Sequence, residues 1–491
     1  MLFHTWLFFV FFLIVYPVFL LLRKHNWWMN LWLMIASYTF YYGWLWDPMY
    51  LLLLFSTSAI DYWMVLCMEK SESQERKRLW LTISLVSNFG FLGYFKYSIF
   101  LTGIANDLIA RLGLPFALPD PVWYPNNGIA FFGGGSHFFE KVVLPIGISF
   151  HTFQSMSYTI DAYRGNIQVE RSFIRFLTFV SFFPQLVAGP IERASNLLPQ
   201  LQSEPKITWR DIGDGLSLFL VGFFKKVALA DYLSIYVDKV YVDPESFNAP
   251  ALFLATFAFG WQIYFDFSGY TDMARGIAQL MGFRLMLNFN NPYTATGLGD
   301  FWARWHISLS TWFKDYLYFP LGGNRGGKWL TYRNMFLTMV ISGVWHGAAW
   351  VFIIWGALHA FGRVLTRELE QTGFWKDRVP RFAKQMLVFA FVTFTWIFFR
   401  ATVEDEPLNV DLALTIIVRM LTTPWTDPQM PLLMLALILA VWVYQFLYTG
   451  ESWGKRLVEH PRVRIALALA MIAYLLIVAQ PSTKPFIYFD F

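Results

Sequence analysis

The chain has 491 residues, of which 56% are hydrophobic, 20% are aromatic and only 14% are charged. Because soluble domains carry about 25% charged residues, this composition excludes an ordinary soluble enzyme and indicates a protein that crosses a membrane many times. The net charge is only +5 and the single cysteine is Cys67, so the sequence excludes an intramolecular disulfide and offers no basic stripe for nucleic acid.

Segments that could cross a bilayer as helices follow one another along the whole chain. A transmembrane helix needs about 20 apolar residues. Segments of this length fall at 2–22, 27–46, 49–68, 79–100, 251–270, 335–360, 382–400, 431–449 and 465–480. Shorter or more polar candidates fall at 142–160, 172–190 and 215–236. We therefore predict one all-α integral-membrane domain over residues 1–491, whose first segment is retained because it lacks the basic start of a cleaved signal peptide.

Lysine and arginine residues in the loops predict the orientation, because cytoplasmic loops are richer in both. The first five residues carry neither, whereas Arg23 follows the first segment and the basic run 70–78 follows the third. Near the other end, 363–384 and 455–464 are basic and the loop between them is acidic at 404–406. This alternation predicts that both termini are extracytoplasmic.

The segment 335–360 does not fit the alternation. Both of its flanks are basic, yet it is long enough for one crossing and too short for two, which need about 40 residues. Either one flank breaks the charge rule, or the segment dips into the membrane and returns. Gly343, Gly347 and Gly356 would permit a break, and non-helical backbone at membrane depth requires a protein-lined cavity. We favour a funnel with His346 near its bottom.

His346 and His306 are candidates for chemistry because both lie in or beside membrane-like sequence, where a titratable side chain is costly. A neutral imidazole at His346 would be a competent general base. The alternative for each histidine is a structural one, either a hydrogen bond between helices or a place at the membrane interface. The sequence has no HExxH motif and no third ligand at a fixed spacing, so we predict no metal site.

Three further motifs allow a structural and a functional interpretation. Asp272 and Arg275 in DFSGYTDMARG are three residues apart and should pair on one helix face, or else orient a histidine or a donor headgroup. The loop LGGNRGGK, residues 321–328, would form a tight cytoplasmic turn or cradle a phosphate through backbone N–H groups. Lys225 and Lys226 should extend to a membrane interface.

A family resemblance rests on several motifs. The runs DFSGYTDMARG, NFNNPY, GDFWARWHISLSTWFKDYLYFPLGGNRGG and SGVWHGAAWVFIIWGALH follow one another in the second half of the chain. Upstream lie LPIGISFHTFQSMSYTIDAYRG and FFPQLVAGPIER. Together they resemble the membrane-bound O-acyltransferase family, and within it the branch that acetylates bacterial exported polysaccharides such as alginate.

The resemblance implies roles for particular residues. The family's near-invariant catalytic histidine falls on His346, and its second conserved polar position falls on His306, which would orient the donor or stabilise an oxyanion. The implied fold is a ring of transmembrane helices around a central funnel or tunnel with re-entrant segments. The implied acyl donor is acetyl-CoA, with no tightly bound cofactor. It would enter from the cytoplasm past Arg304, Arg325 and Lys328.

The C-terminal sequence FIYFDF resembles an aromatic–Tyr–aromatic tail found in this branch. Tyr488 would either relay the acyl group on the outer side or anchor the tail at the interface. The implied function is transfer of an acetyl group across the bacterial inner membrane, completed by a periplasmic acetyltransferase partner. The alternatives are a transporter or channel, which predicts inverted repeats that the sequence lacks, and a non-catalytic scaffold of a polysaccharide-export complex.

Overall fold

The computed structural model describes residues 1–45, 48–119, 147–401, 409–448, 456–457, 460–477 and 486–487. These residues form helices and connecting turns, and no strand occurs among them. The prediction of an all-α protein is confirmed. The physical reason is that a long apolar segment in lipid can satisfy its backbone hydrogen bonds only within itself, as a helix does.

The N-terminal helices follow the predicted segments closely. They are α1 (Trp6–Leu22), α2 (Asn26–Leu45), α3 (Pro48–Lys70) and α4 (Gln74–Leu92). Helix α4 continues through the π-helical turn η1 (Gly93–Tyr97) into α5 (Ser98–Arg111), so the helical stretch is longer than the predicted 79–100.

The middle of the chain contains the longest helix. The elements are α6 (Ile148–Arg164), α7 (Phe173–Ser181), α8 (Ala194–Gln202), α9 (Trp209–Phe224), η2 (Lys225–Ala230), α10 (Asp231–Val242), η3 (Pro244–Ser246) and α11 (Ala249–Leu280). Helices α9 and α11 approach closely because glycines face each other. A Cβ atom on Gly222 would lie 2.5 Å from the Gly269 carbonyl oxygen, and one on Gly276 would lie 2.6 Å from that of Gly215.

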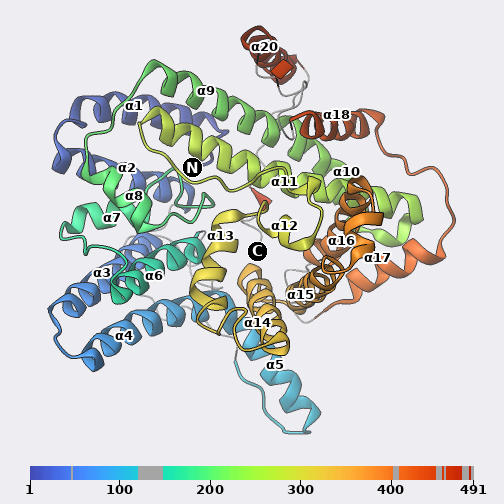
Figure 1. Cartoon of the computed structure of the whole chain (residues 1–491), viewed down its shortest axis with the longest axis horizontal. Coiled ribbons are helices and arrows are strands. Elements are labelled where there is room, and N and C mark those ends of the chain that lie inside the picture. The colour runs from blue at the N-terminus through green and yellow to red at the C-terminus, as the bar shows by residue number, and fades with distance from the viewer. Residues whose placement is uncertain are drawn as a thin grey trace.

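The C-terminal part begins with short helices and ends with long ones. They are η4 (Pro292–Thr294), α12 (Leu298–Trp302), α13 (Ile307–Phe313), η5 (Lys314–Tyr318), α14 (Lys328–His346), α15 (Trp350–Leu369), η6 (Phe374–Arg378), α16 (Arg381–Arg400), α17 (Asp411–Thr422), α18 (Leu432–Tyr448) and α20 (Pro461–Ile477). Figure 1 shows α12 and α13 near the middle of the molecule, with α11, α16, α14 and α6 on different sides of them.

Apolar side chains cover much of the outside of this protein. Leu13 and Leu21 on α1 are 73% and 78% exposed, and Leu476 on α20 is 81% exposed. Exposed apolar surface on this scale suits lipid better than water. By length and apolar composition, two helices among the described residues could cross a membrane, Tyr50–Lys70 and Arg381–Arg400. The apolar helices Trp6–Leu22 and Leu432–Phe446 are shorter.

The predicted segment 335–360 is two helices rather than one. Helix α14 ends at His346, α15 begins at Trp350, and the two pack against each other as an antiparallel hairpin. At the base of the hairpin, Lys328 and Tyr332 of α14 both donate hydrogen bonds to the Glu368 carboxylate of α15. The bond from Lys328 is the main reason that the pKa of Glu368 is lowered. The basic ends of both helices therefore lie on the same side, as a segment that dips in and returns requires.

The apolar window underestimated this hairpin because each helix carries polar residues near its base. The glycines also act differently from the prediction. Gly343 and Gly356 lie inside continuous helices, where a Cβ atom would clash with the Phe352 carbonyl oxygen and the Met339 carbonyl oxygen, respectively. They allow the two helices to approach closely and do not break them. The break falls at Gly347, directly after α14.

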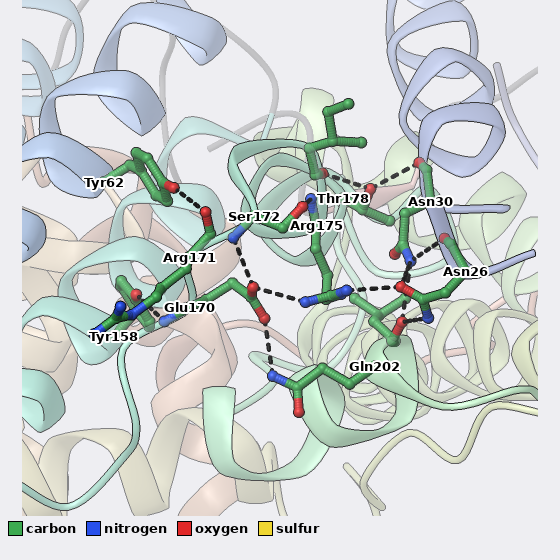
Figure 2. Close-up of polar contacts among 12 residues, drawn as sticks. Asn26, Asn30, Tyr62, Tyr158, Glu170, Arg171, Ser172, Arg175, Thr178 and Gln202 are labelled. Carbon is green, nitrogen blue, oxygen red and sulfur yellow. Dashed lines mark hydrogen bonds and ion pairs between the residues drawn. The ribbon is translucent and has the colours of Figure 1, made fainter. Parts of the chain in front are cut away.

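A buried polar network joins several segments at one end of the helices (Figure 2). Glu170 is almost fully buried, and its carboxylate accepts hydrogen bonds from Arg175 of α7 at 2.7 Å and from Gln202 of α8 at 2.9 Å. Arg175 also donates to the side-chain oxygen of Asn26, the first residue of α2, at 2.7 Å. The network therefore holds the basic turn before α2 against the ends of α7 and α8.

Other predicted cytoplasmic loops lie at this same end. Arg171, next to Glu170, pairs with Glu69 at 3.1 Å, close to the basic run 70–78. Gln74 in that run donates to the Tyr163 hydroxyl at 2.8 Å. Arg164, the residue after Tyr163, donates to the Asp315 carbonyl oxygen in η5. Loops that charge counting assigns to one side of a membrane thus contact the same neighbouring segment, residues 163–175.

Candidate active site

His346 is the last residue of α14 and lies at the tip of the hairpin. It is only 4% exposed. Its ring lies among aromatic rings, with centroid distances of 5.0 Å to Trp345, 5.1 Å to Trp355 and 5.3 Å to Phe399. Two of these neighbours come from other helices, α15 and α16. Apolar packing of this kind excludes bulk water from the imidazole.

His306 is fully buried and immediately precedes α13. Its φ angle is +44°, a left-handed conformation that is uncommon for a residue other than glycine. Backbone strain of this kind persists where surrounding contacts hold it, often at functional sites. Here the contact is Asn288, whose side-chain oxygen lies 3.1 Å from the imidazole Nδ1 and also accepts a hydrogen bond from the Ser308 hydroxyl at 2.9 Å.

The two histidines contact one aromatic cluster although they are 40 positions apart in sequence. The Trp345 ring lies 6.2 Å from the His306 ring and 5.0 Å from the His346 ring, centroid to centroid. Phe150 of α6 packs against both Trp345 and His306. The structure therefore brings together the two histidines that the sequence singled out.

A cavity of about 220 Å³ lies beside α14, and the α14 residue of its lining that is nearest to His346 in sequence is Ser342. Residues of α14 at helical spacing form one wall: Met335, Thr338, Met339 and Ser342. Ser342 lies four residues before His346, which is about one helical turn. The cationic residues that line the cavity are Lys314, Arg363 and Arg367. The lining of this cavity therefore combines apolar side chains with three cations.

The predicted donor-side residues do not line this cavity. Arg304 pairs with Asp300 at 2.6 Å, and Lys328 pairs with Glu368 at the hairpin base. Arg325 is exposed in the glycine-rich turn before α14. Donor binding by these three residues stays a prediction. The sequence interpretation missed Lys314 and Arg363 because nothing in their spacing shows that η5 and α15 meet along α14.

A wider cleft of about 700 Å³ lies on another side of η5. It is lined by Arg164 and Arg193, and the guanidinium of Arg193 stacks on the Tyr316 ring at 4.4 Å. Both arginines have acidic neighbours in the cleft, because Asp315 pairs with Arg193 at 3.2 Å and Asp161 also lies in its wall. This balance of charge makes the cleft a weaker candidate for a phosphate-bearing donor than the basic cavity along α14.

Two lysines predicted to reach an interface are instead paired in the protein. Lys226 is 1% exposed, and its ammonium lies 2.7 Å from Asp266 and 2.9 Å from Asp231. Lys225 lies 2.7 Å from Asp272. The prediction was wrong for Lys226, because its compensating carboxylates come from α10 and α11 and hold it in the interior. The interfacial position of Lys225, whose side chain is 20% exposed, stays a prediction. The predicted pairing of Asp272 with Arg275 is confirmed, at 3.7 Å.

The end of the chain reaches this buried cluster. The Ile487 backbone N–H donates to the Asp266 carboxylate at 2.8 Å. The Phe486 ring is buried against Tyr270, and the Lys226 ammonium lies 4.6 Å from its centroid. Tyr488 itself lies outside the described residues, so its predicted role as an acyl relay stays a prediction.

Polar residues near His346 that the sequence interpretation passed over include Lys96, Tyr97 and His359. The Lys96 ammonium donates to the carbonyl oxygens of Trp345 at 2.7 Å and His346 at 3.0 Å. The Tyr97 hydroxyl donates to the Val344 carbonyl oxygen at 2.9 Å. His359 is buried on α15 with its Nε2 3.0 Å from the Thr395 hydroxyl. Lys96 did carry a signal, since it is a cation inside a predicted membrane segment.

Similarity to known proteins covers most of the chain. Residues 31–403 match the model of the membrane-bound O-acyltransferase family. Among curated proteins, the chain is 41% identical to the probable alginate O-acetylase AlgI of Pseudomonas aeruginosa, over 76% of this chain and 67% of that protein. It is 36% identical to the protein of the same name from Azotobacter vinelandii, over 94% of both. It is 35% identical to the peptidoglycan O-acetyltransferase of Helicobacter pylori, over 78% of this chain and 72% of that protein.

Proposed function

This chain belongs to the membrane-bound O-acyltransferase family, and from that premise we propose that it O-acetylates an exported bacterial polysaccharide, with His346 as the catalytic base. The observation that carries the proposal is the position of His346. It is buried at the tip of a hairpin whose base is basic, about one helical turn beyond a cavity that is lined by three cations, and it shares an aromatic cluster with His306.

The proposed reaction is acyl transfer from a thioester to a hydroxyl group. The His346 imidazole takes the proton of the acceptor hydroxyl as its oxygen attacks the thioester carbonyl carbon. The tetrahedral intermediate then collapses, the carbon–sulfur bond breaks, and the thiolate takes the proton from the imidazolium. His306, oriented by Asn288 through its Nδ1, would hold the donor or stabilise the oxyanion. Surrounding aromatic rings keep water away from the thioester.

The proposed donor is acetyl-CoA, and the cavity along α14 is its proposed path. Its apolar wall suits a pantetheine arm, and the cations of Lys314, Arg363 and Arg367 suit phosphate groups. Arg304, Arg325 and Lys328 would add positive charge around the entrance. Because the basic loops gather at this end of the fold, we infer that it faces the cytoplasm.

The proposed membrane arrangement follows from the same charges. The helices would form a ring around a central funnel, with the α14–α15 hairpin as a re-entrant element and both termini on the extracytoplasmic side of the bacterial inner membrane. There a periplasmic acetyltransferase partner would receive the acetyl group and complete its transfer to the polymer. Alginate is the polymer named for several relatives and peptidoglycan for another, so either class of glycan is a candidate acceptor.

The test is His346→Ala in a host that makes the polymer. We expect loss of O-acetyl groups from the exported polysaccharide, with the variant present in the membrane fraction at the wild-type amount. His359→Ala serves as the matched control, because it removes another buried histidine of the neighbouring helix. Wild-type acetylation in the His346→Ala strain would refute catalysis by this histidine and would favour a scaffold role.

A further inference from the structure

A π-helical turn packs against the end of the helix that carries His346. This turn, η1, interrupts the long helix formed by α4 and α5. Single π-turns inside α-helices are rare and occur frequently at functional sites. Lys96 and Tyr97 are the last two residues of η1, and 249 positions separate Lys96 from Trp345, the first α14 residue that it contacts.

The contacts fall on backbone groups that a helix cannot satisfy by itself. The last carbonyl groups of an α-helix lack the usual amide partner four residues ahead. In α14 the last three residues are Val344, Trp345 and His346. Tyr97 donates to the first of these carbonyl oxygens at 2.9 Å, and Lys96 donates to the other two at 2.7 and 3.0 Å. Two adjacent side chains of one turn thus cap the whole end of the hairpin's first helix.

A cation is well suited to this place. Carbonyl groups at a helix C-terminus carry the negative end of the helix dipole, and a positive charge there is stabilising. Lys96 also lies over the Trp345 ring, 5.9 Å from its centroid. Within the described residues, the Lys96 ammonium contacts the carbonyl oxygens of Trp345 and His346 and the face of the Trp345 ring. These contacts are all with His346 and the residue directly before it.

We propose that Lys96 and Tyr97 are positioning residues for acyl transfer, which set the place of His346 by capping the end of α14. This inference rests on the proposed role of His346. Because the capped carbonyls belong to His346 itself and to the two residues before it, the cap determines where the histidine Cα lies. Trp355 and Phe399 then enclose the ring from α15 and α16. Neither Lys96 nor Tyr97 needs to touch the donor.

A positioning role and a donor-binding role predict different kinetics. A misplaced catalytic group lowers kcat and leaves donor affinity nearly unchanged, whereas loss of a binding contact raises KM. The experiment uses the full chain in membrane vesicles with acetyl-CoA as the probe. The activity is divided by the amount of full-length protein in the vesicles. The variants are Lys96→Met, Lys96→Arg and Tyr97→Phe.

The matched control is Tyr16→Phe. The Tyr16 hydroxyl also donates to a carbonyl at the end of a helix, that of Leu280 in α11 at 3.1 Å, but this helix end carries no proposed catalytic residue. Tyr97→Phe and Tyr16→Phe therefore remove the same kind of hydrogen bond from two different helix ends. Comparison of the two separates an effect on His346 from a general loss of helix packing.

We expect Lys96→Met to lower kcat by about 100-fold, with a KM for acetyl-CoA within about threefold of wild type. Lys96→Arg should recover kcat to within about tenfold, because it keeps a cationic donor. Tyr97→Phe should lower kcat about fivefold, and Tyr16→Phe should change it by less than about twofold.

Two results would overturn the proposal. One is a Lys96→Met variant with wild-type kcat and wild-type KM. The other is a Lys96→Met variant with unchanged kcat and a raised KM for acetyl-CoA, which would make Lys96 a binding residue. If Lys96→Met does not accumulate in the membrane, the two tyrosine variants decide. Equal changes of kcat in Tyr97→Phe and Tyr16→Phe would then overturn the proposal. Activity in His346→Ala would instead refute the proposed catalytic role of His346, so the two failures are distinguishable.

Discussion

Removal of Lys226 should strand two carboxylates in the interior of the protein. The Lys226 ammonium lies 2.7 Å from Asp266 and 2.9 Å from Asp231, and the side chains of Lys226, Asp266 and Asp231 are only 1%, 2% and 10% exposed. At such distances, an effective dielectric constant near 20 gives about 6 kcal/mol of attraction per contact as an upper bound. Measured costs of breaking a buried pair are about 3–5 kcal/mol, since a stranded carboxyl group can take up a proton instead of staying charged.

We therefore expect Lys226→Met to destabilise the protein by about 3–5 kcal/mol. The assay is thermal unfolding of the purified full chain in detergent, followed by tryptophan fluorescence at one scan rate. A surface pair gives the matched control. Arg111 lies 3.0 Å from Asp107, and their side chains are 76% and 51% exposed. Arg111→Met should cost less than about 1 kcal/mol, because solvent screens that pair.

A rescue experiment separates stranded charge from lost packing. Lys226→Met combined with Asp266→Asn and Asp231→Asn replaces both carboxylates by neutral amides. The amide oxygen introduced at position 266 would still accept the Ile487 N–H, which the Asp266 carboxylate accepts at 2.8 Å in the wild type. We expect the triple variant to recover most of the lost stability. The reasoning fails if Lys226→Met unfolds at the wild-type temperature, or if the triple variant is less stable than the single one.

The remaining predictions concern the active site. Asn288→Leu removes the hydrogen-bond acceptor that lies 3.1 Å from the His306 Nδ1. We expect kcat to fall about 10- to 100-fold, while the amount of folded protein in the membrane stays within about twofold of wild type. An unchanged kcat would show that Asn288 does not orient His306. Arg363→Met should raise the KM for acetyl-CoA about 10-fold with little change in kcat, because it removes a cation from the cavity wall. Arg111→Met removes an exposed arginine outside that wall and should change the KM by less than about twofold. Equal effects of these two arginines would place the donor elsewhere.

Only part of the α14–α15 hairpin was predictable from the amino-acid sequence. Basic charge on both flanks of 335–360 favoured a segment that returns to its own side. The contact between Lys328 at the start of α14 and Glu368 near the end of α15 places the two flanks together. Hydropathy could not find the two helices, because their polar ends fall outside an apolar window. Glycine identity suggested flexibility at Gly343 and Gly356, but the opposing backbone makes them sites of close packing.

The candidate site divides in a similar way. His306 and His346 stood out because a histidine in or beside a membrane segment is energetically costly. That cost can be recognised from the hydrophobicity of the neighbouring residues in the sequence alone. Lys96 met the same criterion but stood alone in its segment, 249 positions from its nearest partner in α14. The pairing of Lys226 with Asp266 was hidden for the same reason, and the expectation of an interfacial lysine followed from treating its helix alone.

The amino-acid sequence by itself determined the helical class, the positions of most helices, the sidedness expected from loop charge and the identity of the two histidines. These properties depend on local composition and on the transfer of single residues into lipid, which each segment carries with it. The tertiary structure alone decided which groups meet: the cap on α14, the acceptor that orients His306, the cations along the cavity and the buried ion pairs. Such contacts join residues distant in sequence, and they arise only when packing of the helices brings those residues within hydrogen-bonding distance.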